Sequence, residues 1–244
     1  MPSLSAYKSD LDYSYATGAF PAVECLKHRG ESVRRILLHS KAAGTDLEQM
    51  MLDYADQLSV RAEQADRVLR MVSGKDNCFA AVVFEKFQDA LNPDLPHVVL
   101  HHPSDFGNLG TILRTALGFG IHDIALIRPC ADPFDPKVVR GSMGSLFRMR
   151  LHLFDDFAAY QELYPDHAMY PFMLDASRPM EEVLACGIPD RYALIFGNEG
   201  SGLPKEFSEV GQPVRIDSST EVDSLNLSIA AGIGIYRFTH AGRA

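Results

Sequence analysis

From residue 97 onward, short apolar segments alternate with segments of helical periodicity. The apolar segments predict strands at residues 98–100, 124–127, 146–151, 169–174, 192–196 and 214–216. Helices are expected at residues 108–119, from 136 to about 140, at 155–163 and from about 224 to 239. Parallel strands need long crossover connections, which are usually helices. The alternation therefore predicts an α/β domain whose parallel sheet is covered on both faces.

A smaller α/β domain is expected at residues 1–90. Strands are predicted at residues 33–39, 58–63 and 79–85, and helices at 46–57 and 64–71. The segment DALNPDLP, residues 89–96, is rich in proline and turn-forming residues. We therefore expect three parts, which are a domain at 1–90, a linker at 91–96 and a larger domain at 97–244.

Charge and cysteine content exclude several classes of protein. The 244 residues include 23 basic and 32 acidic side chains, a net charge of −9, which argues against coating nucleic acid by bulk charge. No apolar run reaches the roughly 18–20 residues of a membrane helix, and the first residues lack the apolar segment of a signal peptide. Cys25, Cys78, Cys130 and Cys186 are far apart and form no CxxC pair. We expect a cytoplasmic protein without a membrane segment, disulfides or a metal site.

Three segments have features of a ligand site. The first is HHPSDFGNLGTILRTALGFGI, residues 101–121, which follows a strand and opens a helix. Gly107 and Gly110 allow close backbone approach, Asn108 is a candidate N-cap, and Arg114 lies on the first turns of the helix. An ordinary strand–turn–helix junction with an exposed arginine is the alternative.

The second segment is LIFGNEGSGLP, residues 194–204, in which three glycines follow an apolar strand. A phosphate-binding loop for nucleoside triphosphates is excluded, because Leu203 and Pro204 stand where that motif needs lysine and serine or threonine. The spacing of Gly197, Gly200 and Gly202 does not fit GxGxxG either. A loop that wraps a ligand at the C-terminal end of a sheet remains, with a flexible turn as the alternative.

The third segment is VDSLNLSIAAGIGIY, residues 222–236. Ser224 and Asn226 stand where a helix begins, and alanines and glycines follow. The small residues favour a helix that is buried or forms a dimer contact.

Together the three segments resemble the motifs of the SpoU/TrmH family of RNA ribose 2′-O-methyltransferases in the SPOUT superfamily. The family pattern N-x-G-x-x-x-R-T-A matches residues 108–116, F/M-G-x-E-G-x-G-L matches 196–203, and S-L-N-x-S-x-A matches 224–230. The resemblance covers residues 97–244 and implies a parallel sheet with a deep C-terminal trefoil knot. It also implies S-adenosylmethionine as cofactor, homodimers, and methyl transfer to structured RNA. Residues 1–90 more weakly resemble the RNA substrate-binding domain of some members.

Specific residues follow from the motif matches. Arg114 is the implied catalytic residue, acting either as a base or as a cation that stabilises the developing alkoxide. The implied polar partners are Asn108, Glu199, Ser224 and Asn226. The implied cofactor contacts are Gly197, Ile216, Leu225, Leu194, Phe196 and Gly202.

RNA contacts are expected in a basic run. Lys137, Arg140, Arg148 and Arg150 occur without an intervening acid, which predicts a phosphate-binding patch or, alternatively, a solvated face. Arg34 and Arg35 are candidates for a second anchor.

The RNA itself is not named by the sequence. A separate N-terminal domain favours ribosomal over transfer RNA, because members that act on rRNA often carry one. A catalytically inactive knotted RNA-binding protein and an unrelated nucleotide-binding α/β protein are the alternatives. The intact polar residues argue against the first, and the missing nucleotide motifs against the second.

Overall fold

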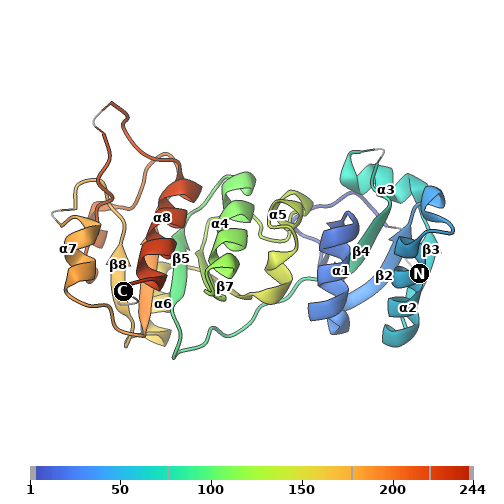
Figure 1. Cartoon of the computed structure of the whole chain (residues 1–244), viewed down its shortest axis with the longest axis horizontal. Coiled ribbons are helices and arrows are strands. Elements are labelled where there is room, and N and C mark those ends of the chain that lie inside the picture. The colour runs from blue at the N-terminus through green and yellow to red at the C-terminus, as the bar shows by residue number, and fades with distance from the viewer. Residues whose placement is uncertain (1–3, 76, 177, 220, 242–244) are drawn as a thin grey trace. The chain divides into compact units, whose positions relative to one another are not determined.

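The computed structural model describes residues 4–75, 77–176, 178–219 and 221–241. The chain packs as two compact units (Figure 1). Unit 1 comprises Met1–Phe87 and Asp132–Arg148, and unit 2 comprises Gln88–Ala131 and Met149–Ala244. The predicted domains differ from these units in two segments. Residues 132–148 pack with the N-terminal residues, and residues 88–96 belong to unit 2.

Unit 2 contains a five-stranded sheet in the order β7-β6-β5-β9-β8, and every neighbouring pair is parallel. The strands are β5 (His97–His101), β6 (Asp123–Ile127), β7 (Arg150–Phe154), β8 (Ala168–Pro171) and β9 (Tyr192–Phe196). The helices are α4 (Phe106–Gly118), α6 (Phe157–Leu163), α7 (Met180–Ala185) and α8 (Leu227–Thr239). The predicted parallel α/β sheet is confirmed.

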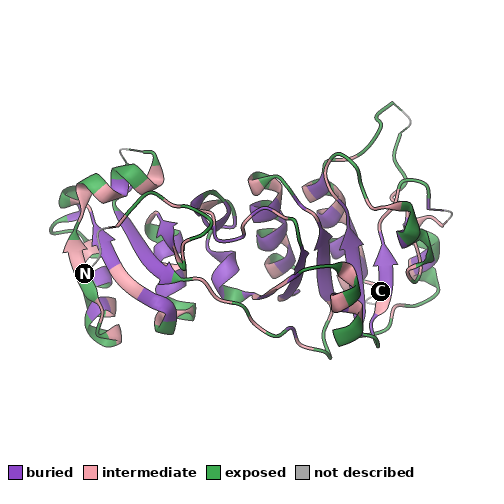
Figure 2. Cartoon of the chain, turned by 180° about the vertical axis from the view of Figure 1, so that it is seen from behind, coloured by how far each residue is buried: buried purple, intermediate pink, exposed green. Residues whose placement is uncertain are grey.

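Helices pack on both faces of this sheet. Tyr160 of α6 belongs to a core cluster with Val99 and Ile195. On α8, Phe238 packs against Tyr170 and Tyr192. Helices α4 and α8 lie side by side (Figure 1). The strands are buried along most of their length (Figure 2), as expected for strands covered on two faces.

Two strand predictions in this half of the chain were wrong. Residues 146–151 form the 3-10 turn η3 (Ser145–Arg148) and only the start of β7. Their apolar residues are buried for a different reason, since Phe147 packs edge-on against Phe84 at 4.9 Å within unit 1. Residues 214–216 make only isolated bridges, in which Val214 pairs with Phe172 and Arg215 with Pro179. Helix α7 was not predicted.

Unit 1 contains a four-stranded sheet in the order β1-β4-β2-β3. The strands are β1 (Tyr13–Thr17), β2 (Val33–Leu38), β3 (Arg61–Gln64) and β4 (Ala80–Glu85). Only the β2–β3 pair is parallel. The helices are α1 (Ala19–His28), α2 (Asp46–Leu58), α3 (Asp66–Ser73) and α5 (Pro136–Gly141), and short 3-10 turns lie at Gly30–Ser32 and Ser40–Ala42. The sequence analysis missed β1 and α1.

Side-chain contacts explain why residues 132–148 belong to unit 1. The Ser14 hydroxyl donates to the carbonyl of Phe134, and Asp132 accepts hydrogen bonds from Tyr7 and Lys86. The expected linker is not a free connection either. Leu91 is buried in the core of unit 2, and its N–H donates to the Tyr164 hydroxyl at 3.1 Å.

The expected trefoil knot is not tested by these observations and stays a prediction. In the described parts of the chain, every helix is too short or too polar to cross a membrane.

Candidate functional site

The loop that follows β9 turns back on itself within a few residues. The N–H of Gly202 donates to the carbonyl of Asn198 at 2.9 Å, and the reverse bond measures 3.2 Å. A Cβ added at Gly197 would lie 2.2 Å from the carbonyl carbon of Gly202. Residue 197 therefore has to be glycine, because the chain's own backbone occupies the space of a side chain.

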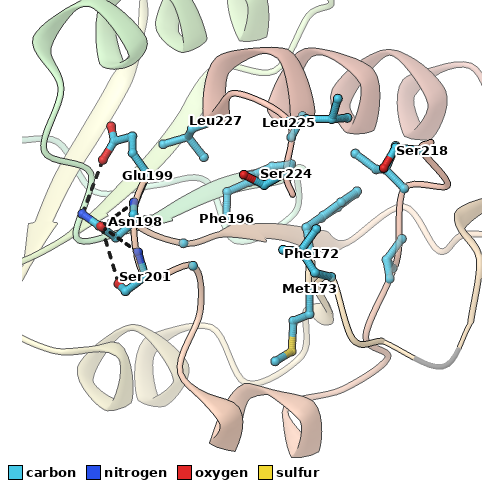
Figure 3. Close-up of a pocket in the computed structure, with 17 residues that line it drawn as sticks. Phe172, Met173, Phe196, Asn198, Glu199, Ser201, Ser218, Ser224, Leu225 and Leu227 are labelled. Atoms are coloured by element: carbon cyan, nitrogen blue, oxygen red, sulfur yellow. Dashed lines mark hydrogen bonds between the residues drawn. The ribbon is translucent and has the colours of Figure 1, made fainter. Parts of the chain in front are cut away.

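This loop forms one wall of a pocket of about 190 Å³ in unit 2 (Figure 3). The pocket combines apolar side chains with exposed backbone of the glycine loop, and its lining residues are Phe172–Leu174, residues 196–202, Val214, Ile216, Ser218, Ser224, Leu225, Leu227 and Ala230. Five predicted cofactor contacts are among them, namely Phe196, Gly197, Gly202, Ile216 and Leu225.

One predicted cofactor contact lies elsewhere. Leu194 is fully buried in β9 and does not line the pocket. Sequence reasoning missed the wall formed by Phe172–Leu174 and Ser218. Phe172 has no motif around it, and its stacking on Phe196 at 4.4 Å is a tertiary contact that no local pattern reveals.

Glu199 is a charged residue of the pocket wall that is held by several hydrogen bonds. Its carboxylate accepts hydrogen bonds from the N–H of Ser104 (3.0 Å), the hydroxyl of Ser104 (2.8 Å) and the N–H of Asp105 (3.0 Å). Burial alone would raise the pKa of Glu199, but these donors stabilise the charged form and lower the pKa to about 2. Glu199 is therefore ionised at neutral pH.

The same network joins all three motif segments. The side-chain amide of Asn108 donates to Glu199 at 3.3 Å and accepts from the amide of Asn226 at 3.0 Å. Asn226 is in turn the N-cap of α8, because its Oδ1 accepts from the N–H of Ser228 at 2.9 Å. Asn108, Glu199 and Asn226, which are far apart in sequence, form one chain of hydrogen bonds.

The predicted N-cap of α4 needs correction. The N-cap is Asp105, whose carboxylate accepts from the N–H of Asn108 at 2.7 Å. The helix consequently starts two residues earlier than expected, at Phe106. This leaves the Asn108 side chain available to bridge Glu199 and Asn226.

Arg114 lies in the third turn of α4, with an exposed side chain. Within the described part of the chain, its guanidinium makes no hydrogen bond or ion pair. Ser224 lines the pocket, and its hydroxyl has no hydrogen-bond partner among the described residues. Two of the implied functional groups thus keep their hydrogen-bonding capacity unused.

The cations of the predicted basic run separate. Lys137 and Arg140 lie on α5 and Arg148 ends η3, so these three belong to unit 1. Arg150 belongs to unit 2, where it makes a two-pronged ion pair with the buried Asp123. A cation held in this way is not available to phosphate, so Arg150 leaves the predicted patch.

The two arginines of the expected second anchor also have ion-pair partners, and their contact with RNA stays a prediction. Arg34 pairs with Asp12 and Glu85, and Arg35 pairs with Glu63. Across the described residues, no group of three or more histidine, cysteine or acidic side chains is arranged to hold a metal ion.

The fold and the site define a class of protein. Unit 2 is a parallel α/β domain with a glycine loop, a pocket and a polar network after the strands, which is where open α/β sheets bind ligands. Residues 96–236, more than half of the chain, match the model of the SpoU rRNA Methylase family. The chain belongs to this family.

Two curated relatives agree with this assignment. The chain is 31% identical over 135 residues to a 23S rRNA (adenosine(1067)-2′-O)-methyltransferase of Streptomyces laurentii, which covers 54% of this chain and 49% of the relative. It is 31% identical over 134 residues to the 23S rRNA (guanosine(2553)-2′-O)-methyltransferase RlmP of Bacillus subtilis, covering 54% of this chain and 53% of that protein. The match therefore spans about half the length of these curated relatives.

A solved structure extends the similarity in fold to almost the whole chain. The SpoU methyltransferase AviRb of Streptomyces viridochromogenes, in complex with AdoMet, superposes with a TM-score of 0.80 at 22% identity. The superposition covers 94% of this chain and 90% of that one, so both units have counterparts there.

Proposed function

We propose that this protein transfers a methyl group from S-adenosylmethionine to a ribose 2′-hydroxyl of structured RNA, with ribosomal RNA favoured over transfer RNA. The observation that carries the proposal is the hydrogen-bonded chain of Asn108, Glu199 and Asn226 beside a pocket, with Arg114 exposed on the helix that supplies Asn108. The printed activities of the two 23S rRNA relatives support the same reaction and the same class of RNA.

The pocket suits the proposed cofactor. Ile216 and Leu225 offer apolar surfaces for an adenine ring, and the glycine loop offers backbone groups for polar atoms. A Cβ at Gly202 would meet nothing within 4 Å, so the loop stays open at that point. When bound, S-adenosylmethionine supplies an electrophilic methyl group on a sulfonium centre.

The residues of the chain have separable tasks in this reaction. An alcohol is a weak nucleophile, so its proton has to be removed or its developing negative charge stabilised. Arg114 can serve either need, and its five N–H donors are unpaired among the described residues. Glu199 fixes Asn108, which holds Asn226, while Ser224 keeps a hydroxyl at the pocket for the substrate.

A second copy of the chain is the proposed partner. Phe119 and Tyr236 are 38% and 47% exposed, and their rings lie 5.5 Å apart at the ends of α4 and α8. Ile229 on α8 is 54% exposed. Apolar surface of this kind favours a dimer contact along these two helices, and α4 also carries Arg114. The cytoplasmic location expected from the sequence stays a prediction.

Cofactor binding is tested first, by calorimetry with S-adenosylhomocysteine. We expect binding to the full chain, and none to a Gly197→Val variant, because its side chain would collide with the backbone at Gly202 and displace the loop. Gly118→Ala is the matched control, since a Cβ there meets nothing within 4 Å. A folded wild-type chain that binds ATP but not S-adenosylhomocysteine would contradict the proposal.

RNA binding is tested through Arg140 and Arg148, two cations of the predicted basic run. Reversing Arg140 or Arg148 to Glu should weaken binding of transcribed 23S rRNA fragments and lower the slope of log affinity against log salt by about 1. Lys8→Glu changes the net charge equally on an exposed residue outside the patch. If Arg140→Glu and Arg148→Glu both have the wild-type slope, Lys137, Arg140 and Arg148 form a solvated face. Methyl mapping of RNA from a deletion strain then identifies the nucleotide.

A further inference from the structure

His102 has a left-handed backbone conformation. It directly follows β5, and its φ of 58° lies in the left-handed region, which residues other than glycine seldom adopt. Backbone strain of this kind persists only where surrounding contacts hold it, and such positions cluster at functional sites. Here the strained residue lies two positions before Ser104, the first donor to Glu199.

The side chain of Asn198 holds this conformation from the neighbouring loop. Its amide donates to the carbonyl oxygen of His102 at 2.9 Å. Its own oxygen accepts from the N–H of Gly200 at 2.9 Å and of Ser201 at 3.2 Å. One side chain therefore links the glycine loop that lines the pocket to the turn that precedes α4.

Other contacts fix His102 in the same place. Its N–H donates to the carbonyl of Ile127 at 3.2 Å, and its ring stacks on His101 with centroids 3.7 Å apart. Asn198 nevertheless supplies the only hydrogen bond to the His102 carbonyl among the described residues. In the sequence, His102 is followed by Pro103 and then by Ser104 and Asp105, whose N–H groups bind Glu199.

We propose that Asn198 is a positioning residue for methyl transfer. By holding His102 in the left-handed conformation, it directs the N–H groups of Ser104 and Asp105 at Glu199. Glu199 then holds Asn108 and, through it, Asn226. The inference rests on the proposed function, and it adds a residue that the family motif leaves open as "x".

Kinetics of the full chain test the proposal. Asn198→Ala should lower kcat at least tenfold, since Glu199 loses the turn that supplies its donors. Adding His102→Gly to the Asn198→Ala variant should raise kcat at least fivefold, because glycine adopts a positive φ without strain. Adding His102→Ala to the Asn198→Ala variant removes the same ring but keeps the strain, so kcat should not rise. His102→Gly alone should stay within twofold of wild type in kcat.

The rescue separates this role from simple shaping of the glycine loop. If Asn198 only shapes that loop, Asn198→Ala raises KM for S-adenosylmethionine, and a change at His102 in the other loop cannot repair it. That outcome overturns the proposal. If the alanine variant does not fold, Asn198→Asp takes its place. Its oxygen still accepts from Gly200, while the amide donor to His102, Ser104 and Glu199 is lost and a negative charge is added.

A second measurement does not depend on activity. In wild-type protein the carboxyl of Glu199 should titrate near pH 2 by carbon-13 NMR. In Asn198→Ala its pKa should rise towards the ordinary value, as hydrogen bonds to the charged form are lost. An unchanged pKa in the folded variant overturns the inference whether or not the chain methylates RNA. If the wild-type chain does not transfer methyl groups, but the pKa of Glu199 still rises in Asn198→Ala, only the proposed function is contradicted.

Discussion

The two ends of the sheet in unit 2 carry polar clusters that differ in burial and in how their hydrogen bonds are satisfied. At the N-terminal ends of the strands, His97, Asp123 and Tyr160 are fully buried and hydrogen-bonded. The two nitrogens of His97 pair with the Tyr160 hydroxyl at 2.9 Å and the Asn92 carbonyl at 2.8 Å. At the C-terminal ends, Asn198 and Glu199 are half-buried beside a pocket. The first cluster is closed, and the second is open to a ligand.

The arginines show the difference most clearly. Arg150 meets Asp123 through two hydrogen bonds, of 2.6 and 2.5 Å, so its charge is matched inside the protein. Glu199 instead receives its hydrogen bonds from N–H groups and a hydroxyl, and Arg114 has no partner among the described residues. A polar cluster whose hydrogen bonds and charges are all paired within the protein stabilises the fold. A cluster that leaves a cation unpaired keeps that cation available to a substrate.

The largest expected effect is on catalysis at the open end. Arg114→Ala should lower the rate of methyl transfer about 100- to 1,000-fold, the usual cost of removing a group that stabilises developing charge. The free energy of unfolding should change by less than about 0.5 kcal/mol, because the side chain is exposed and unpaired. Single-turnover kinetics and urea unfolding measure the two quantities.

Arg114→Lys sharpens this result. Substantial residual activity would favour simple charge stabilisation, since lysine keeps the cation but loses the planar fork. Near-wild-type turnover of Arg114→Ala would contradict the proposed role of Arg114 and remove the contrast with Arg150.

The next effect is on stability at the closed end. Asp123→Ala should lower the free energy of unfolding by about 3 kcal/mol, because it leaves Arg150 and the N–H of Asn92 without their partner. Methyl transfer per folded molecule should stay unchanged, since Asp123 lies at the opposite end of the strands. A loss of turnover in the folded variant would show that the two clusters are coupled.

The smallest effect is a pH dependence of stability at the closed end. Burial, with a contribution from the neighbouring His167, lowers the pKa of His97 to about 4. The unfolded chain therefore takes up a proton near pH 6.5 while the folded chain does not, so stability falls as the pH drops from about 6.5 to 4. Between pH 7 and 5 the contribution of His97 is about 2 kcal/mol.

Urea unfolding at both pH values measures this contribution. His97→Gln serves as the reference, since glutamine is neutral throughout, and its loss on acidification should be smaller by that amount. Equal losses in the two proteins would show that His97 has the same pKa in the folded and the unfolded chain.

The motif segments were predicted more accurately than the elements around them. Arg114, Glu199 and Asn226 stand in residue patterns that mark them locally, and the structure brings Glu199 and Asn226 together through Asn108. Strand β7 was misplaced by several residues, because Leu146 and Phe147 are as apolar as a strand but are buried against unit 1. Periodicity reports that a residue is buried, and it does not report what buries it.

The sequence by itself determined the parallel α/β order, the glycine loop and the residues available for chemistry, because each is set by local composition and spacing. Only the tertiary structure decided which cations stay available. Arg150 and Arg34 look like Arg114 in the sequence, yet carboxylates from distant segments pair with both of them, whereas Arg114 has no partner among the described residues. It also decided the strain at His102, which depends on an amide from a loop 96 residues away. Contacts between distant segments depend on how the sheets place them, and no local pattern contains that information.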